Sequence, residues 1–419
     1  MTSQSQAVDV ATAPPAGRAA TPASPSPGRA GPPTAEGFVL VDKPLGWTSH
    51  QVVGRLRRRL DLRKVGHAGT LDPLATGLLV CGVGPATRLL GYIQGEDKTY
   101  LARLRFGVET TTEDSAGHIT RARGAVGLTR DDLLAAAADF LGRIEQVPST
   151  VSAIKVDGQR AYNLVRKGEK PQLKARQVEI TRLDWGLGQS HLVSLAQLSP
   201  RTVAGSSAGQ AKRRPPQRDL GQAMTPDDPA LRARAGTSGL TTRSGAPLTS
   251  AAGRPVSTPP RTAADASRRT APTAGRGPGT MPPAPVIPVF DIDLTVDCSA
   301  GTYVRALARD LGEAVGTGAH LVALRRLRTG PFSVTEAALG HDGFKSGGPV
   351  QVLPVTAVMG RILPLRRLEG DLVRRVSHGQ ALDLALEGPT LLVGPADEAL
   401  AVYAPAGDEA RPQTVLVRG

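Results

Sequence analysis

The chain has 419 residues, of which 40% are hydrophobic and 21% charged, so it can bury at least one sizeable core. Its net charge of +14 favours a polyanionic partner, but residues 201–286 carry 13 Lys or Arg against 4 Asp or Glu, so the rest is only mildly basic. Two cysteines outside any CxxC motif and seven scattered histidines exclude a disulfide framework and give no support for a metal site. No apolar run approaches the length of about 18 residues that a membrane span needs, and the N-terminus has no signal-like apolar stretch, so we expect a cytoplasmic protein without membrane contact.

Residues 1–36 are dominated by Pro, Ala, Ser and Gly and show no hydrophobic period, which is typical of a disordered tail. Order is expected to begin with the apolar run at residues 37–41, which favours a strand. A helix is expected to follow from Thr48 or Ser49. Its apolar side would carry Val52, Val53, Leu56 and Leu60, with Arg55, Arg57, Arg58 and Arg59 around the rest.

Gly-rich and apolar stretches alternate along residues 65–91, which predicts a loop followed by short buried elements. The loop places Asp72 between two leucines and before Pro73, which disfavours helical backbone at Asp72. We expect the flanking leucines to keep water from this carboxylate. An alternative is that Asp72 caps a helix that begins at Pro73, since Asp-Pro is a common helix start. These residues alone leave both interpretations open.

Beyond this loop, the alternation at residues 99–106 predicts a strand, and Thr129 with Asp132 resembles a capping box that would open a helix reaching Leu141. From about 187 to 286 no aromatic residue occurs, and Pro, Gly, Ser, Thr, Ala and Arg dominate. Such a segment cannot bury enough apolar surface to offset its loss of conformational entropy. We therefore expect a disordered insertion within one domain.

Strand-like sequence resumes at once after this segment. Apolar and polar residues alternate along 290–296, which predicts a half-buried strand, and a helix with Val304, Leu307, Leu311 and Val315 inward should follow. Residues 355–419 read as a small β domain, because short apolar runs alternate with turn residues. Those runs are 391–393, 400–403 and 414–417.

Several motifs, taken together and in this order, closely resemble the bacterial tRNA pseudouridine-55 synthase family. The resemblance covers residues 37–185 and 287–335, and it is weak beyond 355. The insertion is a departure from the family pattern. The motifs are VDKPLG at 41–46, GHAGTLDPLATGLL at 66–79, DKTY at 97–100 with Thr110, Thr112, Asp114 and Gly117 beyond it, PSTVSAIK at 148–155 with Tyr162, CSAGTYVR at 298–305, GAHL at 318–321 and LRRL at 324–327.

The resemblance implies an α/β (α+β) fold, with a mixed, largely antiparallel sheet and flanking helices. Residues 37–350 would be the catalytic domain, interrupted at about 187–286, and 355–419 a small β domain of the kind that binds RNA in such enzymes. The implied reaction converts uridine to pseudouridine at position 55 in the T-arm of tRNA, with the target base flipped out. It needs neither cofactor nor metal, because the isomerisation involves no net redox change. The implied partner is tRNA, bound by a monomer without a protein partner.

Three residues match catalytic positions of the family. Asp72 matches the nucleophile, which would stand beside the sugar C1′ where positive charge develops. Arg305 matches its ion-pair partner, the cation that an ionised carboxylate in an apolar pocket requires. Tyr100 matches the tyrosine that lies against the base and helps remove the C5 proton. Taken singly, Arg305 would be read as a surface arginine and Tyr100 as core packing.

The remaining matches concern substrate binding. Tyr303 matches a second tyrosine of the uracil pocket, and Leu324 matches an apolar wall, although either alone would be read as a core residue. His67 matches a histidine that holds the disrupted T-loop. Lys43 and Pro44 match a turn beside the active-site loop, and we expect a structural role for them.

Three alternatives remain at this point. The chain could be an RNA-binding or tRNA-folding protein without catalysis, but Asp72, Tyr100 and Arg305 are all present. It could modify another RNA, such as rRNA or an RNA presented by a guide complex, although it lacks the long Lys-rich extensions of the guide-dependent type. The basic insertion could be the main RNA binder, but its Pro and Gly content without aromatics favours a solvated linker.

Overall fold

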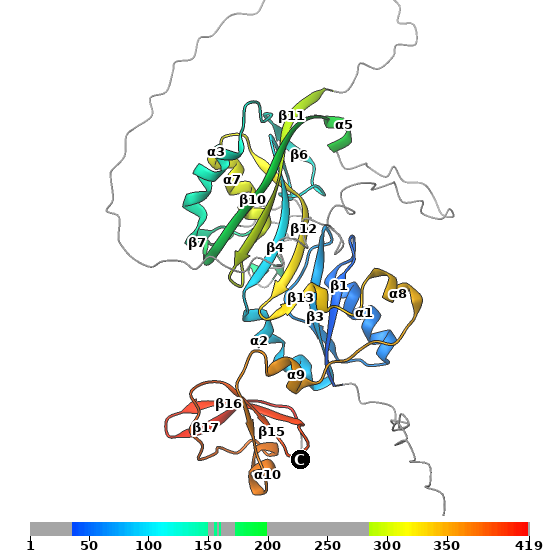
Figure 1. Cartoon of the computed structure of the whole chain (residues 1–419), viewed down its shortest axis with the longest axis vertical. Helices are drawn as coiled ribbons and strands as arrows, with labels where there is room; N and C mark the ends of the chain where they lie inside the picture. Colours follow the sequence, from blue (N-terminus) through cyan, green and yellow to red (C-terminus); the bar gives the residue numbers. More distant parts are fainter. Residues whose placement is uncertain (1–35, 150–154, 157–158, 161–171, 199–284, 418–419) are drawn as a thin grey trace, which may run out of the picture.

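The computed structural model describes residues 36–149, 155–156, 159–160, 172–198 and 285–417 (Figure 1). The expected disordered tail and most of the expected insertion lie outside these residues. So do Tyr162 and five residues of the motif at 148–155. What the sequence predicts for these segments therefore stays a prediction.

The larger part of the molecule is built on a nine-stranded mixed sheet with helices packed around it (Figure 1). The strands follow the order β1-β3-β12-β4-β11-β10-β7, while β2 pairs with β3 and β13 with β12. Neighbours are antiparallel except β3 and β12, which run parallel. The predicted α/β (α+β) class with a largely antiparallel sheet is confirmed. The strands are β1 (Gly37–Lys43), β2 (Val65–His67), β3 (Ala75–Val83), β4 (Lys98–Phe106), β7 (Gly142–Gln146), β10 (Arg176–Ser194), β11 (Val286–Cys298), β12 (Ala319–Thr329) and β13 (Phe332–Ser333).

Shorter elements complete this part. Two small hairpins pair β5 (Val108–Thr110) with β6 (Ile119–Ala122), and β8 (Lys155–Val156) with β9 (Gln159–Arg160). The helices are α1 (Ser49–Leu60), α2 (Leu90–Gly95), α3 (Arg130–Ala137), α5 (Leu195–Leu198), α7 (Val304–Ala314) and α8 (His341–Ser346). Helix α3 ends earlier than the expected Leu141, because residues 138–140 tighten into a 3₁₀ turn.

Local sequence signals located two other elements well. Helix α1 begins after Thr48, whose hydroxyl accepts a hydrogen bond from the backbone N–H of Gln51. The side-chain oxygen of Gln51 accepts from the Thr48 N–H in turn, which completes a capping box. Along β11 the alternating residues of 290–296 bury their apolar members, as predicted. Strand β3 differs from expectation. It is nine residues long and almost wholly buried rather than one of several short elements.

The insertion begins later than the predicted residue 187. Strand β10 continues to Ser194 and pairs with β11 from Gly188 to the end. The composition placed the start of the insertion too early because Gly188, a residue type that is rare in strands, was read as part of a linker. The ring of Phe290 occupies the place where a side chain would stand, and a Cβ there would lie 1.9 Å from the ring. The glycine thus reflects a close packing contact rather than an absence of structure.

The C-terminal part is a four-stranded sheet in the order β14-β15-β16-β17, so the predicted small β domain contains the three runs read as strands. Its core is joined to the larger part, because Leu391 and Val393 share a cluster with Phe38 and Leu40 of β1. The other face of β1, with Val39 and Val41, packs into the main core. The elements are α9 (Val355–Met359), β14 (Leu365–Arg367), α10 (Asp371–Ser377), β15 (Thr390–Val393), β16 (Ala399–Ala406) and β17 (Glu409–Val415).

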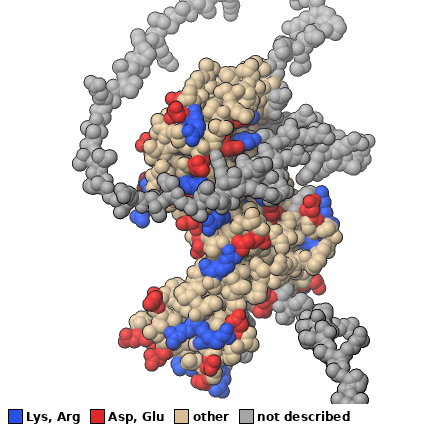
Figure 2. All heavy atoms as spheres, viewed as in Figure 1, with Lys and Arg blue, Asp and Glu red and all other residues tan. Residues whose placement is uncertain are grey.

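Charges of both signs are interspersed on the described surface. Figure 2 shows basic and acidic side chains mixed over one face, with a group of Lys and Arg on the C-terminal domain. This mixture agrees with the mildly basic balance of the sequence outside residues 201–286. None of the helices in the described part of the chain combines the length and apolar character needed to cross a membrane.

The close approach of β3 to β12 gives a first testable prediction. Gly77 has a φ of +99°, and a Cβ on it would lie 2.2 Å from the carbonyl oxygen of Arg326. We expect Gly77→Ala to lower the free energy of unfolding by about 3 kcal/mol or more, because backbone atoms on both strands must shift. Urea denaturation measures this change.

Gly54 provides the matched control. It lies inside α1, and a Cβ there would meet nothing within 4 Å. Gly54→Ala should raise the free energy of unfolding by about 0.5–1 kcal/mol, because alanine is the better helix former. Equal effects of the two substitutions would contradict the close strand contact at Gly77.

Candidate active site

Asp72 lies in the loop between β2 and β3, and helix α1 holds this loop in place. The hydroxyl of Ser49 accepts a hydrogen bond from the Leu71 N–H at 2.9 Å and donates to the Leu71 carbonyl at 3.1 Å. The Ala75 N–H donates to the Asp72 carbonyl at 3.0 Å, which closes a turn around Pro73. The first residue of α1 therefore fixes the position of Asp72.

One alternative and one expectation for Asp72 are wrong. It does not cap a helix, because the turn leads directly into strand β3. The neighbouring leucines do not keep water from it either, although Leu71 lines the same cavity, while Leu74 packs against the main core. The Asp72 side chain remains 41% exposed and faces a cavity.

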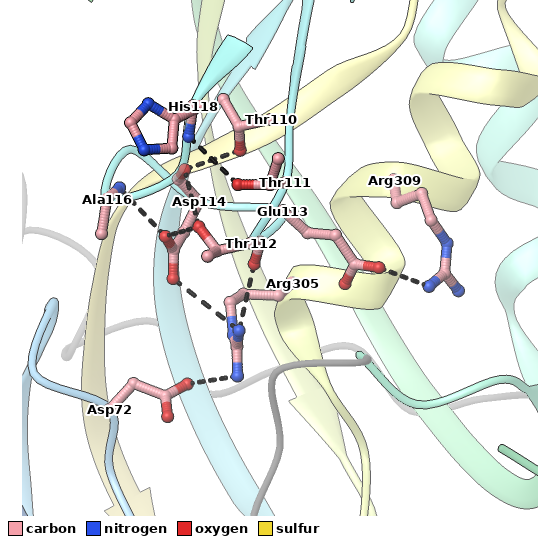
Figure 3. Close-up of polar contacts among 10 residues, drawn as sticks. All are labelled: Asp72, Thr110, Thr111, Thr112, Glu113, Asp114, Ala116, His118, Arg305 and Arg309. Carbon is pink, nitrogen blue, oxygen red and sulfur yellow. Dashed lines mark hydrogen bonds and ion pairs between the residues drawn. The ribbon is translucent and has the colours of Figure 1, made fainter. Parts of the chain in front are cut away.

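Arg305 meets the Asp72 carboxylate from the first turn of α7 (Figure 3). Its Nη2 lies 2.9 Å from Oδ2 of Asp72, and its Nη1 donates to the Thr112 carbonyl at 3.0 Å. The Arg305 side chain is only 5% exposed, which rules out the reading of a surface arginine. The guanidinium thus presents a fixed positive charge to Asp72.

Asp114 is a second carboxylate beside Arg305, and it was not among the predicted site residues. Its Oδ2 lies 3.8 Å from Nη1 of Arg305, and its side chain is 8% exposed. The Thr112 hydroxyl and the Ala116 N–H donate to its Oδ1 (Figure 3). Asp114 belongs to the motif after β4, but only the tertiary contact between this turn and α7 reveals its relation to Arg305.

Most of the predicted site residues line one cavity of about 550 Å³. Tyr100 of β4 and Leu324 of β12 come from the sheet, while Tyr303 and Arg305 come from the start of α7. Asp72 completes this set. The structure therefore brings together five of the six residues. The antiparallel pairing of β4 with β12, and the parallel pairing of β12 with β3, place these segments side by side.

His67 is the exception, because it is not among the residues that line the cavity. It ends β2, with its ring 5.6 Å from the ring of His50 in an edge-to-face arrangement. Partial burial lowers the pKa of His67 to about 4, and the neighbouring His50 and Arg326 act in the same direction. His67 is therefore neutral at physiological pH.

Cations outnumber acids around the cavity. Among the described lining residues, Lys98, Arg176, Arg305 and Arg326 are basic and Asp72 is acidic. Arg326 belongs to the motif at 324–327 but was not among the predicted site residues. It is 1% exposed, and its Nε donates to the Leu78 carbonyl at 2.7 Å. Burial, followed by the charge of Arg326, lowers the pKa of Lys98 to about 8.

Tyr100 experiences opposing influences. Burial raises the pKa of its phenol, whereas the charge of Arg326 and a hydrogen bond with Arg326 lower it. Burial is the larger effect, so the phenol is protonated at neutral pH. Arg326 nevertheless makes the phenolate easier to form than it would be in an apolar site alone.

Gln146 fixes the backbone of Tyr303, a role that no sequence pattern indicated. Its amide oxygen accepts from the Tyr303 N–H at 2.8 Å, and its amide nitrogen donates to the Tyr303 carbonyl at 3.2 Å. Gln146 is 1% exposed at the end of β7. A buried amide that pairs in both directions holds the start of α7 against the sheet.

Lys43 has the structural role that was expected for its turn. Its Nζ donates to the carbonyls of Pro44 at 3.1 Å and Trp47 at 2.6 Å. Burial lowers its pKa to about 8, and the charge of Asp72 opposes this shift. Lys43 thus stabilises the turn before α1, and the Gly46 N–H joins this turn to the Pro73 carbonyl at 2.8 Å.

The arrangement suits chemistry on a planar ring attached to a group that develops positive charge. An aromatic and an apolar side chain can enclose the ring, and a fixed carboxylate can face the reacting carbon. Among the described residues, no three His, Cys, Asp or Glu side chains gather as a metal ion would require.

Family models and curated relatives agree on one family. Residues 57–198 match the TruB family pseudouridylate synthase N-terminal domain, and residues 305–342 match the tRNA pseudouridylate synthase B C-terminal domain. A tRNA pseudouridine synthase B from Arthrobacter sp. (strain FB24) is 37% identical over 371 residues, which are 88% of this chain and 90% of the relative. One from Paenarthrobacter aurescens (strain TC1) is 36% identical over 393 residues, 91% and 96% of the two chains. The solved structure of a Cbf5-Nop10-Gar1 complex aligns with 92% of this chain and 86% of its own at 17% identity, with a TM-score of 0.49.

The low pKa of His67 predicts a pH dependence of stability. Its pKa lies near 4 in the folded chain and near its ordinary value of 6.5 in the unfolded chain, so the unfolded chain binds more protons between these values. Stability from this group is full above pH 6.5 and is lost as pH falls toward 4. We expect His67→Gln to remove roughly 1–2 kcal/mol of this acid-induced loss.

Urea denaturation of the wild type and His67→Gln between pH 4.5 and 7 measures the effect. The difference between the two curves isolates His67 from carboxylates that titrate in the same range. Parallel curves would contradict the assignment of a partly buried, neutral histidine.

Proposed function

Because this chain belongs to the tRNA pseudouridine synthase B family and forms pseudouridine in tRNA, we propose that it acts on uridine 55 of the T-arm, with Asp72 as nucleophile and without a cofactor. The observation that carries the proposal is the Asp72 carboxylate, which faces the cavity and is held 2.9 Å from a nearly buried guanidinium. The cavity walls have the aromatic and apolar character that a flipped uracil requires.

The reaction is balanced without a co-reactant. The N1–C1′ bond of uridine breaks, the uracil turns, and C5 bonds to C1′. The C5 proton leaves, and N1 gains a proton. Positive charge develops at C1′ when the glycosidic bond breaks, so an anion at that position stabilises the transition state. Asp72 supplies this anion, and Arg305 keeps the carboxylate oriented while it acts.

Asp114 and Thr112 orient Arg305 in turn. The Thr112 carbonyl and the Asp114 carboxylate both lie beside Nη1, which leaves Nη2 directed at Asp72. A guanidinium held on several sides cannot swing away from the carboxylate. This explains why an arginine rather than a lysine suits position 305.

We assign Tyr100 to the uracil and to removal of its C5 proton. The phenol must lose its own proton to act as a base. Burial, with a smaller effect of Asp72, raises its pKa, and Arg326 opposes this rise. Tyr303 and Leu324 enclose the base from other sides of the cavity. His67 lies outside the cavity lining and is assigned to the RNA around the flipped nucleotide.

The ion pair inside a cavity argues against a protein that only binds or refolds RNA. A uridine in rRNA or in a guided RNA is the competing target. Activity on a tRNA transcript that depends on uridine 55 distinguishes the two.

Asp72→Asn should reduce pseudouridine formation at least about a thousandfold, because the amide cannot provide the anion at C1′. Release of tritium from C5 of uridine in an unmodified tRNA transcript measures the rate. We expect the Kd for tRNA to change by less than about threefold, since backbone contacts dominate RNA binding. Asp61→Asn, at an exposed residue after α1, is the matched control and should retain full activity.

A transcript with cytidine at position 55 separates the possible targets. It should release no tritium with the wild type if uridine 55 is the target. Rapid turnover by Asp72→Asn would contradict the nucleophile. Unchanged tritium release from the cytidine-55 transcript would contradict the position.

A further inference from the structure

We propose that Arg309 and Glu113 are positioning residues for the catalytic step. Their ion pair, one helical turn beyond Arg305, sets the turn that carries Asp114 and thereby fixes Arg305 against Asp72. This inference rests on the proposed function, because it assigns the pair a part in the reaction rather than in stability alone. Neither Arg309 nor Glu113 is among the described residues that line the cavity.

The geometry pairs two basic residues of a helix with two consecutive acidic residues of a turn. Arg305 and Arg309 are four residues apart on α7 and so lie on the same face. Nη1 of Arg309 lies 2.7 Å from Oε1 of Glu113, and Nη1 of Arg305 lies 3.8 Å from Oδ2 of Asp114. Figure 3 shows the two contacts side by side, with the Asp72 contact below Arg305.

The backbone of this turn is in an unusual conformation at Glu113. Its φ of +59° lies in the left-handed region, which a residue other than glycine adopts at a cost. Neighbouring contacts must hold such a conformation. The Glu113 carbonyl accepts from the Leu321 N–H at 3.0 Å, and the Glu113 side chain is held by Arg309. The Glu113 N–H also donates to the Thr110 carbonyl at 3.2 Å, and the Ser115 N–H donates to the Leu321 carbonyl at 3.0 Å, so Arg309 adds a side-chain anchor to a turn that backbone bonds already hold.

Arg309 is itself constrained on all sides of its guanidinium. Nε lies 2.7 Å from Oδ1 of Asp310, Nη1 contacts Glu113, and Nη2 donates to the Val147 carbonyl at 2.8 Å. The Arg309 and Glu113 side chains are 23% and 12% exposed, so water screens their charges only in part. Arg309 therefore joins α7, the end of β7 and the turn into one rigid unit.

This rigidity bears on the reaction because the same turn supplies two of the contacts to Arg305. The Thr112 carbonyl and the Asp114 carboxylate flank Glu113 in sequence and both lie at Nη1 of Arg305. If Glu113 moves, both move with it, and the guanidinium gains freedom to turn from Asp72. Small errors in the placement of catalytic groups are costly in rate.

A purely structural ion pair is the competing explanation, and the chain contains a matched control. Arg103 of β4 and Asp293 of β11 form an ion pair within the nine-stranded sheet. Its two contacts are Nε to Oδ1 at 2.7 Å and Nη2 to Oδ2 at 2.9 Å. Arg103 is 22% exposed, as Arg309 is, while Asp293 at 34% is more exposed than Glu113, and neither residue of this pair is among the described residues that line the cavity. Arg103→Met should therefore lower stability without a change in turnover.

The experiment uses the full chain in single-turnover reactions with enzyme in excess and a tRNA transcript tritiated at C5 of uridine. Arg309→Met should lower the rate constant by about ten- to a hundredfold, with the Kd for tRNA within about threefold of the wild type. Arg309→Lys should recover part of the rate, because its ammonium can still pair with Glu113. The double variant Arg309→Met/Asp114→Asn should be no slower than Asp114→Asn, since both act through Arg305.

Three results would overturn the inference. These are a wild-type rate for Arg309→Met, additive effects of Arg309→Met and Asp114→Asn, and a loss of tRNA binding that accounts for the whole change in rate. If Arg309→Met does not fold, Glu113→Gln removes the charge at constant shape and is judged by the same results.

Failure of the proposed function gives a different pattern. If the wild type forms no pseudouridine, or Asp72→Asn remains active, the proposed function is overturned and this inference with it. If the wild type is active and Asp72→Asn is not, the Arg309 variants test the positioning role alone.

Discussion

The contact between Asp72 and Arg305 is the interaction on which the candidate active site depends. The Asp72 carboxylate faces a cavity that combines aromatic and apolar side chains with several cations, and a fixed partner is needed to hold it in one orientation. Arg305 is that partner, with a side chain that is only 5% exposed, at a distance of 2.9 Å. Such a buried cation is itself costly unless acceptors surround it, and Thr112 and Asp114 provide them. The loop, the helix start and the turn are thus mutually dependent.

The sheet brings these three segments together. Strand β12 pairs with β4 on one side and with β3 on the other, so the loop before β3 reaches the same end of the sheet as Tyr100 and Leu324. The close approach of β3 and β12 depends on Gly77, where a side chain would collide with the partner strand. Helix α7 then covers the cavity with its N-terminal residues, anchored by Gln146.

Sequence patterns predicted the features that depend on residues close together in the chain. The capping box before α1 and the alternation along β11 are local, and both were confirmed. The family motifs also identified five residues that line one cavity. Long-range contacts were not readable. Asp114 and Gln146 matter through partners that are distant in sequence, and Gly188 resembled a linker because the ring that covers it belongs to another strand.

A crystal structure with a T-arm RNA that carries 5-fluorouridine at position 55 tests the central claim most directly, because fluorine at C5 replaces the proton that the reaction removes. The account predicts that the base lies in the cavity beside Tyr100 and Leu324. The Asp72 carboxylate should face the sugar C1′ and keep its contact with Arg305. A base bound outside the cavity, or a carboxylate separated from Arg305 and turned away from the sugar, would contradict it.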